Sequence, residues 1–455
     1  MTVEFGGDSL AGASFRDPES RVWKGENGLI REFSGEGIRA WNTVCSSGLA
    51  EELLQKKMLV PFAPCAGSAA KICLEELPFF TYPYEWCFDQ LRAAALLTLE
   101  VMFAALERNM ILKDASAFNV SFAGCRPVFI DHGSFTFYRE GGTWSGYRQF
   151  CRHFLAPLLV MRYCDVREGL QLRNFLDGLP FDYAIAHLPW LAKMRPGVWM
   201  HLILHEKMER KYSLAAGDDP VQIPALPKSR LIALLRSLES LILSLKLPAA
   251  NSEWDNYYED HSYERSSFAA KKELTARICR DLQGKKVIDF GANSGVFSRI
   301  AAESAEAVLA ADIDHGALTA LWKNGNEKIT PVWQDLNNPS PWCGIANEER
   351  SSFLHRAKGD LAMGLALVHH LRIGSLWPME RIAELFAQTA PAALVEFVPA
   401  EDVQVRRLLR ARENIFEDYT PERFLAVFRR HYAGLQVFPL PESGRFLLLA
   451  KERIG

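Results

Sequence analysis

Two carboxylates and one amide of chemical interest lie within residues 111–135, ILKDASAFNVSFAGCRPVFIDHGSF. Asn119 follows Asp114 by five positions, and Asp131 comes twelve positions later. Transfer of a phosphoryl group depends mainly on positioning and charge neutralisation, and it uses a carboxylate near the attacking hydroxyl and oxygen ligands for magnesium. The three residue types, in this order, are those that phosphoryl transfer from ATP needs.

A second group of residues follows the strand-like run VIDFG, in which a glycine-rich turn leads into a helix pattern. Gly291 and Gly295 lack a Cβ, so the backbone can approach a ligand closely there, and the helix start offers unpaired N–H groups. Asp312 ends the next strand pattern, where a carboxylate can accept both hydroxyls of a ribose. Asp335 ends the third strand pattern and can accept a hydrogen bond from an adenine amino group. A glycine-rich turn alone is a weak signal, and the two acids strengthen it.

Three further residues are candidates for handling the acceptor of a transferred group. His369 and His370 lie at the end of the fourth strand pattern, and Glu396 lies near the end of the fifth. Ligands of α/β sheets bind at this edge, and a neutral imidazole there can take a proton from a hydroxyl or an amine. The alternative is structural: one histidine is buried and the other shapes the pocket wall. Glu396 has the same two interpretations.

The elements that position the second group alternate between strand and helix patterns from residue 254 onward. This alternation predicts a parallel sheet with helices on both faces. A short ESG turn separates the last two strand patterns and predicts an antiparallel hairpin at the edge of the sheet. We therefore predict an α/β fold with a Rossmann-like seven-stranded sheet. Its predicted strands are 287–291, 307–314, 329–335, 361–371, 393–398, 435–441 and 445–452.

The first half of the chain is less regular, and its middle is helical and aromatic. A buried helix is predicted over 91–107, and a leucine-rich stripe predicts a second over 228–246. We divide the chain into a domain at 1–246, a linker at 247–253 and a second domain at 254–455.

Composition limits the possible functions. The net charge of −3 gives no overall basic excess, so no nucleic-acid partner is expected. The most apolar stretch carries Glu100 and predicts a core helix rather than a membrane span. The nine cysteines are scattered with no CxxC pair, which predicts reduced thiols and a cytoplasmic location, without a disulfide framework or a zinc site.

Residues 254–455 resemble the class I S-adenosylmethionine-dependent methyltransferases, on the glycine-rich turn, the two strand-end acids and the terminal hairpin. The resemblance implies that S-adenosylmethionine is the cofactor, with Asp312 at its ribose and Asp335 at its adenine. Asn293 stands where many members have glycine. The resemblance also implies that the amino-acid end of the cofactor is surrounded by Asp289, Gly291, Asn293 and Gly295. It further implies that the cofactor contacts Ile313 and Leu336.

The stretch that begins at Asp114 resembles the catalytic and metal-binding loops of protein kinases and aminoglycoside phosphotransferases. The resemblance implies a small N-lobe at about 1–80 and a helical C-lobe at about 81–246. Asp114 would be the catalytic carboxylate, and Asn119 and Asp131 would hold Mg²⁺ with ATP.

This sequence departs from the kinase pattern in the segments that bind the phosphates of ATP. No glycine-rich loop of the usual spacing and no Val-Ala-Ile-Lys strand is present. Arg31 is the best substitute for the phosphate-binding lysine, with Glu51 or Glu52 as its helix partner. These departures favour a degenerate kinase-like domain.

Most of the chain also resembles a group of bacterial proteins that includes NoeA-like methyltransferases. The resemblance is carried by PFFTYPYEW, LKDASAFNV, RPVFIDHGSF, WSGYRQFCRHFLAPLL, LALVHHL, VEFVP and IFEDYT.

The combined interpretation is a methyltransferase acting on an oxygen or nitrogen atom of a small-molecule or glycan-type acceptor, with the kinase-like domain aiding recognition of the acceptor. Two alternatives remain open. One is a bifunctional enzyme that phosphorylates its acceptor with ATP and Mg²⁺, and the other is a non-catalytic binding or assembly module.

Overall fold

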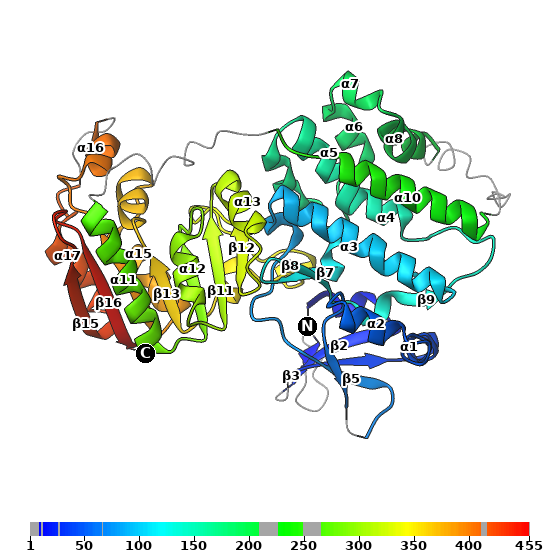
Figure 1. Ribbon diagram of the computed structural model, residues 1–455, viewed down its shortest axis with the longest axis horizontal. Helices are drawn as coiled ribbons and strands as arrows, with labels where there is room; N and C mark the ends of the chain where they lie inside the picture. The colour runs from blue at the N-terminus through cyan, green and yellow to red at the C-terminus, as the bar shows by residue number, and fades with distance from the viewer. Residues whose placement is uncertain are drawn as a thin grey trace. The chain divides into compact units, whose positions relative to one another are not determined.

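The structure is a computed structural model that describes residues 9–10, 12–25, 28–65, 67–208, 226–248, 265–410 and 416–454. It is a mixed α/β protein, as the sequence predicts, and it divides into two compact units (Figure 1). Unit 1 is Met1–Phe122, Pro127–Pro248 and Trp342–Ser351, and unit 2 is Ala123–Arg126, Ala249–Pro341 and Ser352–Gly455. Residues 249–253 of the predicted linker lie outside the described residues.

Unit 1 begins with an antiparallel five-stranded sheet in the order β1-β2-β3-β5-β4. Two helices, α1 and α2, intervene between β3 and β4. Trp41 of α1 stacks on Phe33 of β3, which fixes α1 against the sheet. The elements are β1 (Ser9–Leu10), β2 (Ser20–Gly25), β3 (Gly28–Phe33), α1 (Glu36–Ser46), α2 (Leu49–Gln55), β4 (Phe62–Pro64) and β5 (Lys71–Leu74).

The rest of unit 1 is mainly helical and is built around α3 (Phe88–Glu107), which is apolar on nearly every side and therefore buried. α10 (Lys228–Ser244) buries the predicted leucine stripe. Both predicted helices are confirmed. No helix in the described part of the chain is long and apolar enough to cross a membrane. The remaining elements include β6 (Met110–Leu112), η3 (Ala117–Asn119), β7 (Val120–Ala123), β8 (Arg126–Phe129), η4 (His132–Ser134), β9 (Phe135–Phe137), α4 (Tyr147–Phe150), α5 (Ala156–Tyr163), α6 (Phe181–His187), α7 (Trp190–Lys193) and α8 (Pro196–Val198).

One pair of cysteines departs from the prediction of reduced thiols. Cys65 and Cys73 form a disulfide with a Cα–Cα distance of 5.6 Å. β4 and β5 pair in antiparallel register, with Ala63 opposite Cys73. Cys65 follows Ala63 by two residues, so it lies diagonal to Cys73 on the same face of the pair. The prediction is wrong for these two residues because it did not pair the two strands.

Unit 2 contains a seven-stranded sheet in the order β12-β11-β10-β13-β14-β16-β15 (Figure 1). The first five strands are parallel, and β15 and β16 form the predicted antiparallel hairpin. The chain builds outward from β10 to β12 and then crosses to β13 on the other side of β10. In open α/β sheets such a reversal leaves a crevice at the carboxyl ends of the strands. The strands are β10 (Lys286–Phe290), β11 (Ala307–Asp312), β12 (Ile329–Trp333), β13 (Leu361–Gly364), β14 (Ala392–Phe397), β15 (Tyr432–Pro439) and β16 (Phe446–Arg453).

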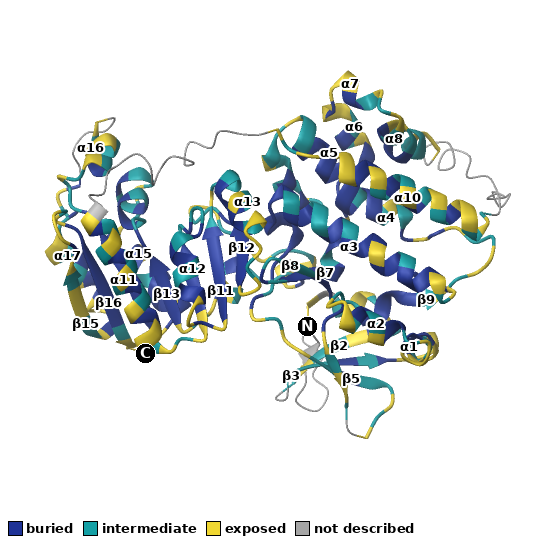
Figure 2. Cartoon of the chain, viewed as in Figure 1, coloured by how far each residue is buried: buried dark blue, intermediate teal, exposed yellow. Residues whose placement is uncertain are grey.

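The strands of this sheet are nearly continuous apolar runs because helices cover both faces. Figure 2 shows β11 and β13 in the colour of buried residues, whereas the edge strand β15 is largely exposed. The helices are α11 (Arg265–Leu282), α12 (Val296–Ala302), α13 (His315–Lys323), α14 (Phe353–Arg356), α15 (Met379–Thr389), α16 (Val403–Leu409) and α17 (Pro421–Phe428).

The fourth strand is shorter than the sequence predicts. β13 ends at Gly364, and Ala366 has a φ of 56°, which takes the backbone out of the extended region. His369 and His370 therefore lie at the start of a helical turn, η9 (His370–Gly374), and not on the strand.

We expect Gly295→Ala to destabilise unit 2 by about 2–3 kcal/mol. Gly295 has a φ of 75°, and a Cβ there would collide with Leu321 Cδ1. Gly325→Ala is the matched control, because Gly325 also has a positive φ of 66° but open space at the Cβ position. It should cost only about 1 kcal/mol. Denaturant unfolding of the two variants measures both effects, and equal losses would show that Leu321 does not constrain the turn.

Candidate functional site

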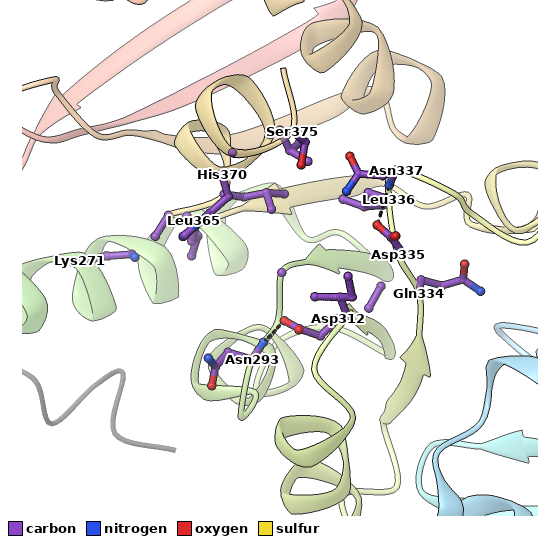
Figure 3. Close-up of a pocket in the computed structure, with 17 residues that line it drawn as sticks. Lys271, Asn293, Asp312, Gln334, Asp335, Leu336, Asn337, Leu365, His370 and Ser375 are labelled. Carbon is purple, nitrogen blue, oxygen red and sulfur yellow. Dashed lines mark hydrogen bonds between the residues drawn. The ribbon is translucent and has the colours of Figure 1, made fainter. Parts of the chain in front are cut away.

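A cavity of about 320 Å³ opens at the carboxyl ends of β10 to β13 in unit 2 (Figure 3). It lies where the strand order reverses, the position expected for a ligand site in such a sheet. Seven of the residues predicted for the site line this cavity: Gly291, Asn293, Asp312, Ile313, Asp335, Leu336 and His370.

The turn between β10 and α12 is held open by left-handed backbone. Gly291, Asn293 and Gly295 have φ values of 72°, 48° and 75°. Asparagine adopts this conformation more readily than other residues with a side chain, which explains why Asn293 can replace glycine. Gly291 and Asn293 line the cavity, and Gly295 is the N-cap of α12.

Asp312 ends β11 and ties the turn to the neighbouring strand. Its Oδ2 accepts a hydrogen bond from the backbone N–H of Asn293 (2.7 Å), and its Oδ1 accepts one from the N–H of Asp314 (2.8 Å). Burial raises the pKa of this carboxyl, against the effect of these hydrogen bonds. Because a carboxylate can accept about four hydrogen bonds, both oxygens can still serve ligand hydroxyls.

Asp335 lies two residues beyond β12, at the far end of the cavity from Lys271 (Figure 3). Its Oδ1 accepts the N–H of Asn337 (2.8 Å), which fixes the loop. Gln334 and Leu336 line the same end. This end therefore offers an acid, an amide and an apolar surface to a planar ring.

Asp289 does not line the cavity. It is buried in β10, and its Oδ2 accepts the hydroxyl hydrogen of Ser298 (2.6 Å). Burial, opposed by this hydrogen bond and supported by the charge of Asp312, raises the pKa of Asp289 to about 7. Asp289 thus joins β10 to α12 behind the turn.

The raised pKa of Asp289 predicts a component of stability that depends on pH. The folded chain holds this proton up to about pH 7, whereas an unfolded chain releases it near the ordinary aspartate pKa of 3.8. The corresponding stability is fully present below the unfolded pKa and is lost as pH rises through 7. We expect the unfolding free energy of Asp289→Asn to fall less steeply than that of wild type between about pH 4 and pH 7. Urea unfolding at several pH values measures this, and parallel profiles would contradict it.

The two histidine rings are neighbours, with centroids 4.2 Å apart, but only one of them lines the cavity. His370 lines the cavity, whereas His369 is buried behind it, with neither ring nitrogen hydrogen-bonded. Burial lowers the pKa of His370 to about 4 and that of His369 well below its usual range. His370 is therefore neutral at pH 7 and is the histidine placed to accept a hydrogen bond from a ligand.

Glu396 lies in a buried ion cluster and does not line the cavity. Its Oε2 is 2.6 Å from Lys271 Nζ, and its Oε1 is 3.5 Å from an Arg445 nitrogen. A carboxylate between two cations is a poor base, so the candidate role of Glu396 as a base does not fit this geometry. Lys271, which does line the cavity, was not recognised from the sequence.

Asp114, Asn119 and Asp131 come together in unit 1, on the wall of a cavity of about 760 Å³. Short helical turns position them: Ser116 caps η3, and Asp131 caps η4. Burial and the charge of Asp131 raise the pKa of Asp114. Burial also acts to raise the pKa of Asp131, but the nearby Arg31 guanidinium and two hydrogen bonds outweigh it and lower that pKa.

Arg31 pairs directly with Asp131. One guanidinium nitrogen lies 2.6 Å from Asp131 Oδ1 and 2.8 Å from Ser20 Oγ. The predicted partners Glu51 and Glu52 are wrong, because Glu52 pairs with Lys56 and Arg108, and Glu51 accepts a hydrogen bond from Gln55.

The residues of unit 1 do not fit a magnesium ion in this arrangement. Asp131 Oδ1 accepts from Arg31 and from the N–H of Gly133, and Oδ2 accepts from Ser134. Asn119 donates to Ser134 Oγ at 3.1 Å. A cation at Asp131 would therefore have to displace the guanidinium. Within the described ranges, no group of three or more His, Cys, Asp or Glu side chains is arranged to hold a metal ion.

The segment Trp342–Ser351 contributes two residues to this cavity of unit 1. Glu349 Oε1 pairs with Arg16 Nε at 2.6 Å. The Arg350 guanidinium lies 4.3 Å from the centre of the Phe118 ring, a cation–π arrangement. Together with Phe80 and Tyr82, these groups give the cavity charged and aromatic walls.

Two solved structures illustrate what the chain is similar to. A structure of the bifunctional kinase-methyltransferase WbdD is 15% identical, with 47% of this chain and 46% of that chain covered and a TM-score of 0.30. The N-methyltransferase NodS from Bradyrhizobium japonicum WM9 is 11% identical, with 42% and 98% covered and a TM-score of 0.30. TM-scores of this size carry no argument about fold or function. No protein-family model matches the chain.

The strand order and the cavity at its reversal define unit 2 as a doubly wound α/β domain with a ligand-sized site. The chain is 32% identical to nodulation protein NoeA from Rhizobium meliloti (strain 1021) over 455 residues, covering 95% of this chain and 94% of that protein. The chain belongs to the NoeA family, which confirms the resemblance inferred from the sequence.

Proposed function

We propose that unit 2 is a methyltransferase that uses S-adenosylmethionine and acts on an oxygen or nitrogen atom of a small-molecule or glycan-type acceptor. The observation that carries this proposal is one cavity that brings together the Gly291 turn, Asp312 and Asp335. Their order along the cavity suits the three parts of this cofactor, with the turn at the amino-acid end, Asp312 at the ribose and Asp335 at the adenine.

The bound cofactor would supply an electrophilic methyl group on a positively charged sulfur. The chain contributes mainly by holding the acceptor in line with that group, an effect worth several kcal/mol in well-oriented systems (about 7–11 at the upper limit). His370 can accept a hydrogen bond from the acceptor hydroxyl or amine. Because its pKa is about 4, it orients the acceptor better than it removes a proton before transfer.

Unit 1 is proposed to recognise the acceptor. Its larger cavity combines aromatic walls with Asp114 and Arg350, groups that suit a polar, ring-containing molecule. Phosphoryl transfer is not proposed, because Arg31 occupies the space beside Asp131 that a metal ion would need.

The proposal is tested by thermal unfolding and mass spectrometry of the full chain. S-Adenosylmethionine or S-adenosylhomocysteine in excess should raise the unfolding temperature by mass action, and S-adenosylhomocysteine should be found in the purified protein. Absence of any binding to either compound would overturn the proposal and favour a non-catalytic module.

A further inference from the structure

Lys271 is a buried cation on the wall of the unit 2 cavity. Its side chain is only 2% exposed, and it projects from α11 toward the cavity (Figure 3). An ammonium group buried in this way is costly unless it is paired. Its retention on a cavity wall therefore calls for a partner within the protein, within a ligand, or both.

The protein partner of Lys271 belongs to a charge-balanced cluster. Lys271 Nζ lies 2.6 Å from Glu396 Oε2, Glu396 Oε1 lies 3.5 Å from Arg445, and Arg445 lies 2.6 Å from Asp402 Oδ2. Two cations thus face two carboxylates. Glu396 lies in β14, and Arg445 directly precedes the adjacent strand β16, so the sheet holds both residues and the cluster fixes the position of the ammonium group.

Lys271 lies at the end of the cavity next to the glycine-rich turn. Its Nζ is 4.4 Å from the centre of the Phe297 ring, and Phe297 is in the first turn of α12, two residues after Gly295. Gln334 and Asp335 lie at the opposite end of the cavity (Figure 3). The ammonium group therefore faces the part of a ligand that the turn holds.

We propose that Lys271 binds the carboxylate at the amino-acid end of the cofactor and so selects cofactors that carry this group. The inference rests on the proposed function. An ammonium group has three N–H donors in tetrahedral directions, so it can bridge Glu396 and a ligand carboxylate. In this arrangement Glu396 and Arg445 are positioning residues.

Isothermal titration of the full chain with S-adenosylhomocysteine and with its decarboxylated analogue tests the proposal. Wild type should prefer S-adenosylhomocysteine by about 10- to 100-fold, the range of one charged hydrogen-bonded contact. In Lys271→Met this preference should fall below about 3-fold, with the affinity for the decarboxylated analogue unchanged. Lys272→Met is the matched control, because Lys272 is on the same helix but does not line the cavity; it should keep the preference.

Loss of Lys271 leaves Glu396 with one fewer cation, so the single variant can fail to fold. The double variant Lys271→Met with Glu396→Gln removes both charges and should show the same loss of preference. The wild-type comparison needs no variant. Wild type that binds both compounds equally, or variants that lose both affinities together, would overturn the proposal and leave Lys271 a purely structural role. Wild type that binds neither compound would instead overturn the proposed function, and this inference with it.

Discussion

Replacing Asp312 by asparagine is expected to weaken binding of S-adenosylmethionine by about 100-fold, or about 2.7 kcal/mol. The carboxylate is fixed by the N–H groups of Asn293 and Asp314 and faces the middle of the cavity, where a ribose would present two hydroxyls. Hydrogen bonds to a charged acceptor are roughly twice as strong as those to a neutral one. An asparagine also has only one acceptor oxygen and turns an NH₂ group toward a partner.

Asp314→Asn is the matched control for this measurement. Asp314 caps α13 and does not line the cavity, and asparagine caps helices as well as aspartate does. Calorimetric titration should find wild-type affinity in Asp314→Asn. If Asp312→Asn also kept wild-type affinity, the assignment of Asp312 to the ribose would be wrong.

Replacing Arg31 by methionine is expected to destabilise unit 1 by about 2–3 kcal/mol. The variant leaves Asp131 as a carboxylate without its counter-charge. The cost is set below that of a fully buried pair because the Asp131 side chain is 19% exposed. The stability that depends on the ionised Asp131 is present above the pKa of the unfolded chain and is lost as pH falls through the lowered pKa of the folded chain. The difference in unfolding free energy between variant and wild type should therefore shrink in acid.

Scanning calorimetry in the presence of Mn²⁺ tests whether Asp131 serves as the partner of Arg31 or as a metal ligand. Without Arg31, Asp131 is open to a divalent cation, so Mn²⁺ should raise the unfolding temperature of Arg31→Met and not that of wild type. Lys113→Met is the control, because Lys113 lines the same cavity but pairs with the partly exposed acids Asp17 and Glu19. It should cost less than about 1 kcal/mol. Wild type that binds ATP with Mg²⁺ in a manner abolished by Asp131→Asn would restore the bifunctional alternative.

The sheet of unit 2 could be predicted from the sequence where local pattern determines structure. β10, β11 and β14 are mainly apolar runs, as expected of strands buried on both faces, and their acids Asp289, Asp312 and Glu396 lie at or near the strand ends. β13 was predicted too long because the sequence does not show the positive φ of Ala366. The same error left unresolved which of His369 and His370 faces the cavity.

Pairings between distant residues could not be predicted. Arg31 and Asp131 are 100 positions apart, and nothing near either residue indicates that one neutralises the other. Lys271 appears in an amphipathic helix as one of two adjacent lysines, and only the fold of unit 2 buries it beside Glu396 of β14. Residue types therefore indicated the chemistry, whereas the three-dimensional contacts decided which groups are available for it.

The separation of Trp342–Ser351 from the rest of unit 1 has a consequence for synthesis on the ribosome. Glu349 and Arg350, which line the unit 1 cavity, are encoded about 100 codons after Pro248, where the preceding part of the unit ends. At 5–20 residues per second, the cavity wall is completed on the order of 5–20 s after that part has been made. A nascent chain, or a fragment that ends at residue 248, therefore has an unfinished cavity in which Arg16 lacks Glu349.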